Sequence, residues 1–280
     1  MAGRAALQGY PPPLTPHDMY PPERIVCLTE ETTETLYLLG EQDRIVGVSG
    51  YTVRPPQARR EKPRVSAFIS ADIPKILALR PDLVLTFSDL QADIVAALIR
   101  AGVAVHAFNQ RTVAEILDMI RILGALVGAH ERAETLANRL TSNLEDARQR
   151  AARRSNRPRV YFEEWDEPMI SGIAWVSELI EAAGGVDIFP ELAPRKSAKD
   201  RIVMPEEVIR RAPDIIIGSW CGKKFRSEKV VARPGFETIP AIKRGRLHEI
   251  KSPLILQPGP AALTDGLAAL EAIISCPNET

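Results

Sequence analysis

Short apolar runs alternate with amphipathic segments along the first 111 residues of the chain. The runs are rich in valine, isoleucine and leucine, which is typical of strands buried on both faces of a sheet. The expected strands cover 24–28, 43–49, 83–87 and 103–108. Apolar side chains at helical spacing fill the segments between them, so helices are expected over 32–40, 74–79 and 91–102. This alternation predicts an α/β fold with a parallel sheet.

The pattern changes at Thr112, where apolar side chains begin to recur at helical spacing up to Val127. Gly128 interrupts this run, and a second helical pattern covers 131–154 with leucines along one face. At 1.5 Å per residue, a helix of that length would reach roughly 36 Å. Such a helix is long for a crossover within one small sheet, so the pattern predicts a strut between two lobes.

The second half of the chain repeats the pattern of the first. The segment "PKILALRPDLVLTFS" from Pro74 and the segment "EEVIRRAPDIIIGSW" from Glu206 share a helix, a Pro-Asp turn and an apolar triplet at a constant offset. Any two helix–turn–strand units look somewhat alike, which is the simpler explanation. The order of the matching segments along the chain nevertheless favours two similar lobes.

These patterns predict a division into four parts. An extended Pro-rich arm covers 1–22, an N-terminal α/β lobe 23–111, a connecting backbone helix 112–156, and a C-terminal α/β lobe 157–280. The expected architecture is therefore two Rossmann-like lobes with parallel sheets, joined by a long rigid backbone helix, with a ligand cleft between the lobes.

Charge and composition narrow the possible functions. The 36 basic and 36 acidic side chains cancel, which argues against a nucleic-acid-binding surface. Three widely spaced cysteines form no CxxC pair and predict no disulfide framework. The sequence as written has no apolar run of signal-peptide or membrane-spanning length. These features predict a cytoplasmic protein without membrane insertion, or a periplasmic one if a leader has been removed.

Searches for catalytic and metal-binding motifs are largely negative. The chain contains no GxxxxGK[ST], no GxGxxG after the first strand, no HExxH and no GxSxG. The four histidines are scattered, so no metal site is expected. Cys221 with the distant His248 could act as a nucleophile and base, although a packed thiol is the simpler interpretation. Glu163 and Glu164 are adjacent on a strand, so only one of them can face a pocket.

Aromatic side chains gather where the expected strands end. Phe87, Trp165 and Trp220 each follow an apolar run, and Tyr51 and Phe68 lie in loops of the first lobe. Aromatic residues make up only 5% of the chain, so this concentration at one edge is informative. Flat apolar walls with a few polar groups are what a large ligand needs, although one or two of these rings could simply close the core of a lobe.

The loop after the second-lobe strand, "SWCGKKF", is the counterpart of "FSDL" after the first-lobe strand. Trp220 and its neighbours therefore stand where Phe87 and Ser88 stand in the first lobe, which predicts one wall of a cleft. Lys223 could offer charge to a ligand's polar edge, although a solvated lysine is the default for such a position.

At the level of whole segments, the chain resembles a known family. The segments "RIVCLTEETTETLYLLGEQDRIVGVSGY", "KILALRPDLVLTF", "SELIEAAGGVDIF" and "PEEVIRRAPDIII" are similar to those of cobalamin- and ferric-siderophore-type substrate-binding proteins of bacterial ABC importers. The resemblance covers roughly residues 24–275 and looks closest to the cobalamin-binding branch. It implies two α/β lobes, a rigid backbone helix and a ligand held between the lobes.

The resemblance also implies roles for particular residues. It places Phe68 and Phe87, with Tyr51 nearby, among the ligand-facing aromatics of the first lobe. In the second lobe it points to Trp165 and to a turn containing Trp220, Cys221 and Lys223, and Glu164 beside Trp165 is the strand glutamate expected to face the ligand. The ligand that it implies is cobalamin or another corrinoid, a large molecule rich in amide groups.

Two departures from the family pattern affect the expected partners. Family members present a surface glutamate on each lobe for docking to arginines of the permease. Glu206 stands at that position in the second lobe, but Pro74 stands at the equivalent position in the first, where Asp72 is the nearest substitute. Docking to a permease is therefore expected to be weakened, and the leader typical of the family is not visible in the sequence.

Together these observations favour a non-catalytic protein that binds a corrinoid or a related macrocycle between two lobes, as a cytoplasmic carrier or sensor. One alternative is the periplasmic component of an ABC importer for cobalamin, haem or ferric siderophore. Another is an enzyme that modifies a bound cofactor with Cys221 or Glu164. The missing catalytic motifs place the enzyme behind the first interpretation, and Pro74 together with the leader that is not visible in the sequence places the importer component behind it.

Overall fold

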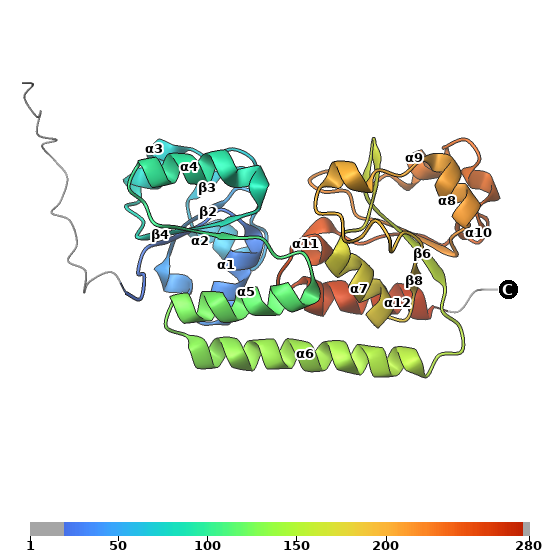
Figure 1. Ribbon diagram of the computed structural model, residues 1–280, viewed down its shortest axis with the longest axis horizontal. Helices are drawn as coiled ribbons and strands as arrows, with labels where there is room; N and C mark the ends of the chain where they lie inside the picture. Colours follow the sequence, from blue (N-terminus) through green and yellow to red (C-terminus); the bar gives the residue numbers. More distant parts are fainter. Residues whose placement is uncertain (1–19, 277–280) are drawn as a thin grey trace, which may run out of the picture.

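The computed structural model of the chain describes residues 20–276. It contains two α/β lobes, with a long helix running beneath both of them (Figure 1). Most of the Pro-rich arm expected over 1–22 lies outside the described residues.

The N-terminal lobe is built on a five-stranded sheet in which every neighbouring pair is parallel. The strand order is β3-β2-β1-β4-β5. The strands are β1 (Ile25–Cys27), β2 (Ile45–Ser49), β3 (Arg64–Ser66), β4 (Leu83–Phe87) and β5 (Val105–Phe108). The helices are α1 (Glu30–Leu38), α2 (Pro56–Glu61), α3 (Ile73–Ala78) and α4 (Ala92–Arg100). The alternation predicted from the sequence is confirmed here, with β3 and α2 as additional elements.

Both faces of this sheet are apolar because side chains on a strand alternate between them. Ile25 and Cys27 face one cluster of buried side chains, whereas Val26 and Leu28 face another. The second cluster includes residues of α3 and α4, so helices cover both faces. A sheet enclosed in this way can expose only its ends, which directs a ligand site to the strand termini.

Two antiparallel helices follow the first lobe, α5 (Val113–Leu126) and α6 (His130–Ala152). Thr112 and Glu115 form a reciprocal capping box that fixes the start of α5. The two helices approach each other closely at Gly124. A Cβ at this position would lie only 2.1 Å from the Cβ of Ala133. α6 has 23 residues, about 34 Å, and spans both lobes (Figure 1). The strut is thus one long helix braced by a shorter one.

The C-terminal lobe repeats the design with a mixed sheet. Its strands are β6 (Arg159–Asp166), β7 (Met169–Ser171), β8 (Val186–Asp187), β9 (Ile215–Gly218) and β10 (Leu247–Glu249). The order is β10-β9-β6-β7, with β8 also paired to β6. The β6–β7 pair is antiparallel and the others are parallel, so the expectation of a wholly parallel sheet is wrong for this lobe. β6 continues beyond its parallel partners and turns back on itself as a hairpin.

Short helices complete the C-terminal lobe. They are α7 (Ala174–Ala182), α8 (Pro205–Arg211), α9 (Ser227–Val231), α10 (Pro240–Lys243), α11 (Ser252–Ile255), a π-helix (Ala262–Gly266) and α12 (Leu267–Ser275). Single 3₁₀ turns occupy Gln42–Arg44 and Asp89–Gln91 in the N-terminal lobe, and Ala198–Arg201 and Phe236–Thr238 in the C-terminal lobe.

The sequence repeat corresponds to a structural repeat at the Pro-Asp turns. Asp82 accepts hydrogen bonds from the backbone N–H groups of Glu23 and Arg24, where the chain enters β1. Asp214 accepts one from the N–H of Arg159, at the start of β6. In each lobe the aspartate therefore links the turn before one strand to the start of the neighbouring strand. The linked strands are β4 and β1 in the N-terminal lobe, and β9 and β6 in the C-terminal lobe.

One continuous apolar core connects the two lobes. It contains Leu85 of the first sheet, Leu140 of the strut and Ile217 of the second sheet. Because the strut contributes to the same core as both sheets, its buried leucines hold the lobes in a fixed arrangement.

Leu136 on α6 is 5% exposed and belongs to this core. Leu136→Ala is expected to lower the free energy of unfolding by roughly 2–4 kcal/mol, through lost burial and the cavity left behind. Urea denaturation of the variant measures the change. Arg139→Ala, at an exposed position of the same helix, is the control and is expected to shift stability by less than about 0.5 kcal/mol. Equal effects of the two substitutions would contradict this assignment of the buried face.

Candidate ligand-binding cleft

A cavity of about 450 Å³ lies between the two lobes. Its lining comes from segments that follow the strands at their carboxyl ends: 29–30 after β1, 49–53 after β2, Phe68 after β3 and Phe87 at the end of β4. The C-terminal lobe contributes Cys221 and Gly222 after β9, and 252–258 after β10. Carboxyl edges of parallel strands are the usual ligand sites of open α/β sheets, and here two such edges face each other.

Three aromatic side chains form the N-terminal wall of the cavity. Tyr51 is 52% exposed, Phe68 is partly buried and Phe87 is 7% exposed, and all three line the space. The guanidinium carbon of Arg111 stands 4.7 Å from the centroid of the Phe87 ring, a cation–π contact that holds this ring in place. These three rings are the first-lobe aromatics that the sequence predicts to face a ligand, and the structure brings them together around one cavity.

Gln91 positions this wall, although sequence patterns gave no sign of it. Its side chain is fully buried and its Oε1 accepts the backbone N–H of Phe87 at 3.0 Å. Its Nε2 donates to the carbonyl oxygens of Phe68 at 2.8 Å and Leu28 at 3.3 Å. One amide group therefore fastens the ends of β1 and β4 to the Phe68 loop. In the sequence Gln91 is simply a glutamine in the first turn after a strand, and this pattern is too common to identify a positioning residue.

Three glutamates at the start of α1 are buried beside the cavity: Glu30, Glu31 and Glu34. Burial, reinforced by repulsion from Glu31, raises the pKa of Glu30 to about 8, and burial raises the pKa of Glu31 to about 7. The pKa of Glu34 is also raised by burial, although Arg54 pairs with it at 3.0 Å. Carboxyl groups with such pKa values are partly protonated near neutral pH.

This acidic helix end is also where the lobes touch. Glu34 accepts the backbone N–H of Ala261 at 3.1 Å, and Arg54 bridges from Glu34 to Asp265 of the π-helix. Gly259 lies so close to α1 that a Cβ there would stand 2.5 Å from the Cβ of Glu31. The segment after α11 therefore closes over α1 and buries its acidic first turns.

Cys221 lies on the C-terminal wall and faces the open cavity, where its side chain is exposed. Its backbone N–H donates to the carbonyl oxygen of Glu164 at 3.3 Å. Burial raises the pKa of its thiol to about 11, and repulsion from the carboxyl groups of Glu164 and Glu30 contributes to this rise. At neutral pH the thiol is protonated and is a poor nucleophile.

Trp220 lies inside the C-terminal lobe, outside the lining of the cavity. It is 3% exposed, packs edge-on against Phe225 with ring centroids 4.9 Å apart, and donates from Nε1 to Glu163 at 2.9 Å. The indole points into the lobe because it donates this hydrogen bond to the fully buried carboxylate of Glu163. The next residue, Cys221, is exposed instead. Ser88, its first-lobe counterpart, is also buried, and its hydroxyl accepts the N–H of Leu90.

Glu164, Trp165 and Lys223 likewise lie outside the cavity lining. Glu164 forms an ion pair with Arg201, whose Nη1 stands 2.6 Å from Oε2, and Arg201 is only 2% exposed. Lys223 forms an ion pair with Asp166 and places its Nζ 3.9 Å from the centroid of Trp165. The lysine charge is thus used within the lobe, which is the physical reason that it does not face the cavity.

The two acidic residues considered for permease docking lie at equivalent helix starts, Asp72 before α3 and Glu206 in α8. Both are exposed, and these helices lie along the same upper side of the molecule (Figure 1). Asp72 differs from Glu206 in that its Oδ1 accepts the backbone N–H of Lys75 at 3.0 Å.

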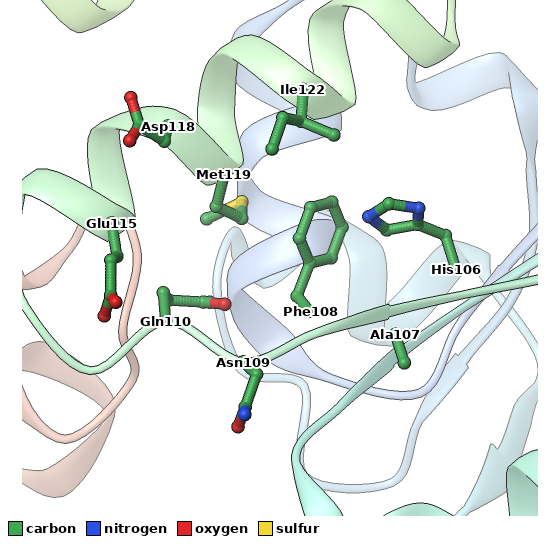
Figure 2. A pocket seen from close by; sticks show the side chains of 9 residues that line it. All are labelled: His106, Ala107, Phe108, Asn109, Gln110, Glu115, Asp118, Met119 and Ile122. Atoms are coloured by element: carbon green, nitrogen blue, oxygen red, sulfur yellow. The ribbon is translucent and has the colours of Figure 1, made fainter.

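A second cavity, of about 250 Å³, lies between edge strand β5 and α5, away from the cleft between the lobes. Figure 2 shows His106 and Phe108 side by side, with Ile122 of α5 above them and Met119 of α5 on the other side of Phe108. The His106 and Phe108 rings are 4.3 Å apart and steeply inclined. This cavity is smaller than the interlobe cavity and is lined by the N-terminal lobe and α5 alone, so the interlobe cavity is the candidate ligand site.

Two α/β lobes on a helical strut, with a cavity between facing sheet edges, define a ligand-binding protein by architecture. A sequence profile of the periplasmic binding protein family matches residues 25–254, and the chain belongs to this family.

Named relatives agree with this assignment. A vitamin B12-binding protein of Vibrio cholerae serotype O1 is 31% identical over 216 residues, which cover 75% of this chain and 77% of that protein. The crystal structure of the periplasmic vitamin B12-binding protein of Vibrio cholerae aligns with a TM-score of 0.72 and 26% identity, over 91% of this chain and 97% of that one. A periplasmic haem-binding protein of Roseiflexus sp. RS-1, in its apo form, aligns with a TM-score of 0.76 and 26% identity, over 90% and 99%. The chain is therefore a substrate-binding protein of the type that serves ABC importers.

Within the described part of the chain, none of the helices combines the length and apolar character that crossing a bilayer requires. Over the same residues, histidine, cysteine, aspartate and glutamate side chains do not gather in threes where they could hold a metal ion.

Proposed function

We propose that the interlobe cavity binds a corrinoid, and that the protein delivers this ligand to an ABC importer. The observation that carries the proposal is the wall of Tyr51, Phe68 and Phe87 at the carboxyl edge of the first sheet, facing the second lobe across the cavity. Flat rings can pack against the face or edge of a macrocycle, and apolar burial supplies most of its binding energy. The vitamin B12-binding relatives support a corrinoid in particular.

The importer role takes precedence over the cytoplasmic carrier or sensor that ranked first on sequence alone. It is supported by relatives named as periplasmic proteins. We further propose that Glu206, and Asp72 to a lesser degree, contact basic residues of a permease. Asp72 already caps α3, and Pro74 carries no charge, so the first-lobe contact would be the weaker one.

An enzymatic role has less support. The thiol of Cys221 has a raised pKa, and the charged groups that influence it are Glu164 and Glu30, whereas His248 has no such influence. Glu164 is held by Arg201. Neither of the residues that sequence reasoning offered as a working group is poised for nucleophilic or acid–base catalysis.

Binding is tested by titrating the purified protein with cyanocobalamin, haemin and a ferric siderophore, followed by absorbance and calorimetry. Cyanocobalamin is expected to bind with one site per chain. Absence of binding to all three ligands would overturn the proposal, and preferential binding of a ferric siderophore would assign the cavity to another ligand class.

Tyr51→Ala is expected to weaken corrinoid binding by roughly 10- to 100-fold, because a half-exposed ring that lines the cavity loses its contact with the ligand. Protein stability should remain unchanged, because the ring is not part of a core. Ile99→Ala, at a similarly exposed apolar position on α4, is the control and is expected to leave affinity unaltered. An unchanged affinity of the Tyr51 variant would remove this ring from the binding wall.

A further inference from the structure

One carboxyl group beside the cleft has a buried oxygen that no donor in the described part of the chain satisfies. Glu30 is 6% exposed and lines the cavity. The backbone of Val53 donates a hydrogen bond to its carboxyl group, but Oε1 has no partner within the described part of the chain. An acceptor that is buried and left without a donor is costly, so such groups usually have a role that the unliganded protein does not reveal.

The neighbouring glutamates differ from Glu30 in this respect. Glu34 is satisfied by Arg54 and by the N–H of Ala261. Glu31 also has an unpartnered Oε1 but does not line the cavity, since Gly259 packs against it. Of these three glutamates, Glu30 is the one that lines the cavity.

The surroundings of Glu30 do not neutralise it by pairing. Glu31 and Glu34 add negative charge on α1, and the thiol of Cys221 lies on the opposite wall. Arg59 of α2, which is exposed at the cavity, lowers the pKa of Glu30 less than burial and Glu31 raise it. This corner of the cavity therefore offers hydrogen-bond acceptors in an environment that is already acidic.

Two ligand chemistries behave in opposite ways in such a corner. A primary amide can donate an N–H to Oε1 and satisfy the orphan acceptor. A carboxylate at the same place has no proton to donate, and above the pKa of Glu30, about 8, it sets two like charges against each other in a desolvated site, which weakens its binding. A site built to receive an N–H therefore rejects the acid analogue more strongly than apolar contacts could.

We propose that Glu30 is a specificity-determining residue that selects macrocycles with amide side chains and disfavours those with carboxylate side chains. This inference rests on the proposed corrinoid-binding function and names the ligand group that the cavity recognises. It predicts that cobalamins, whose ring carries primary amides, are preferred to haem, whose ring carries two propionates.

The test compares cyanocobalamin with its separated monocarboxylic acids, in each of which one propionamide of the corrin ring is hydrolysed. Calorimetry at pH 9, where a carboxyl group with a pKa of about 8 is ionised, is expected to give at least one acid that binds the unmodified protein about tenfold or more weakly than cyanocobalamin. For Glu30→Gln, whose amide can both accept and donate, the difference for that acid is expected to fall below about threefold. Haemin binding should strengthen in the same variant.

Glu31→Gln is the matched control, because it removes a carboxyl from the same helix turn without touching the cavity. It is expected to keep the discrimination of the unmodified protein. Equal loss in both variants would assign the effect to net charge and overturn the role of Glu30. The role of Glu30 would also be overturned if the unmodified protein bound cyanocobalamin and all the acids equally, or if it bound haemin more tightly than cyanocobalamin. Those results would leave macrocycle binding intact, whereas binding of neither macrocycle would refute the proposed function itself.

Discussion

Replacing Glu163 with alanine is expected to lower the free energy of unfolding by roughly 3–5 kcal/mol. Glu163 is fully buried and accepts hydrogen bonds from Arg233 at 2.5 and 2.9 Å, from the hydroxyl of Tyr161 at 3.1 Å and from the indole of Trp220 at 2.9 Å. Removing the carboxylate leaves a guanidinium charge and two polar hydrogens without partners inside the lobe. Urea denaturation at constant pH measures the loss.

Glu145→Ala provides the contrast for this prediction. Glu145 pairs with Arg148 at 3.6 Å, and both side chains are more than half exposed. Solvent screens such a pair, so its removal is expected to cost less than about 1 kcal/mol. If Glu163→Ala were no more destabilising than Glu145→Ala, the buried network would have to be rearranged from the one described.

The stability of the protein is expected to fall as pH rises from about 5 to about 8. Burial raises the pKa of Glu30 from 4.5 to about 8 and that of Glu31 from 4.5 to about 7. Between the unfolded and folded pKa values the folded state binds more protons, so the stabilisation is complete below pH 4.5 and is lost as pH rises through the folded values. At about 1.4 kcal/mol per unit of pKa, the shift of Glu30 alone corresponds to roughly 5 kcal/mol.

The measurement is the difference between the unmodified protein and the double variant Glu30→Gln, Glu31→Gln, by urea denaturation across this pH range. Taking the difference matters because burial lowers the pKa of His106 and His248, which favours folding as pH rises and opposes the glutamates. The double variant is expected to gain stability relative to the unmodified protein as pH increases. A difference that does not vary with pH would mean that the two carboxyl groups are ionised in the folded protein.

The fold could be predicted from the sequence because its signals are local. Apolar runs such as 83–87 and 215–217 and the leucine face of α6 identify strands and the strut directly. β7 was missed because it is three residues long and follows β6 after a two-residue turn, so its pairing has no periodic signal of its own. The antiparallel edge of the second sheet follows from that hairpin.

The binding site was predicted less completely, for reasons that are not local. Position after a strand locates a residue at the sheet edge but does not say whether its side chain turns inward. Trp220 turns inward because Glu163, on a neighbouring strand, accepts its indole N–H. Glu30 looks from its sequence context like an exposed acid at a helix start, and it is buried because distant segments of the chain close over α1. Both outcomes depend on contacts that a sequence pattern does not contain.

The apolar core that α5 and α6 share with both sheets has a consequence for how ligand could leave the protein. Opening the cleft as a hinge would draw one lobe away from the strut and expose part of that core to water, at about 25 cal/mol for every Å² uncovered. Small rearrangements of the side chains and loops at the cavity mouth avoid this cost. Release that needs a wider aperture must draw its energy from outside the chain, so the work of unloading falls on the partner that receives the ligand.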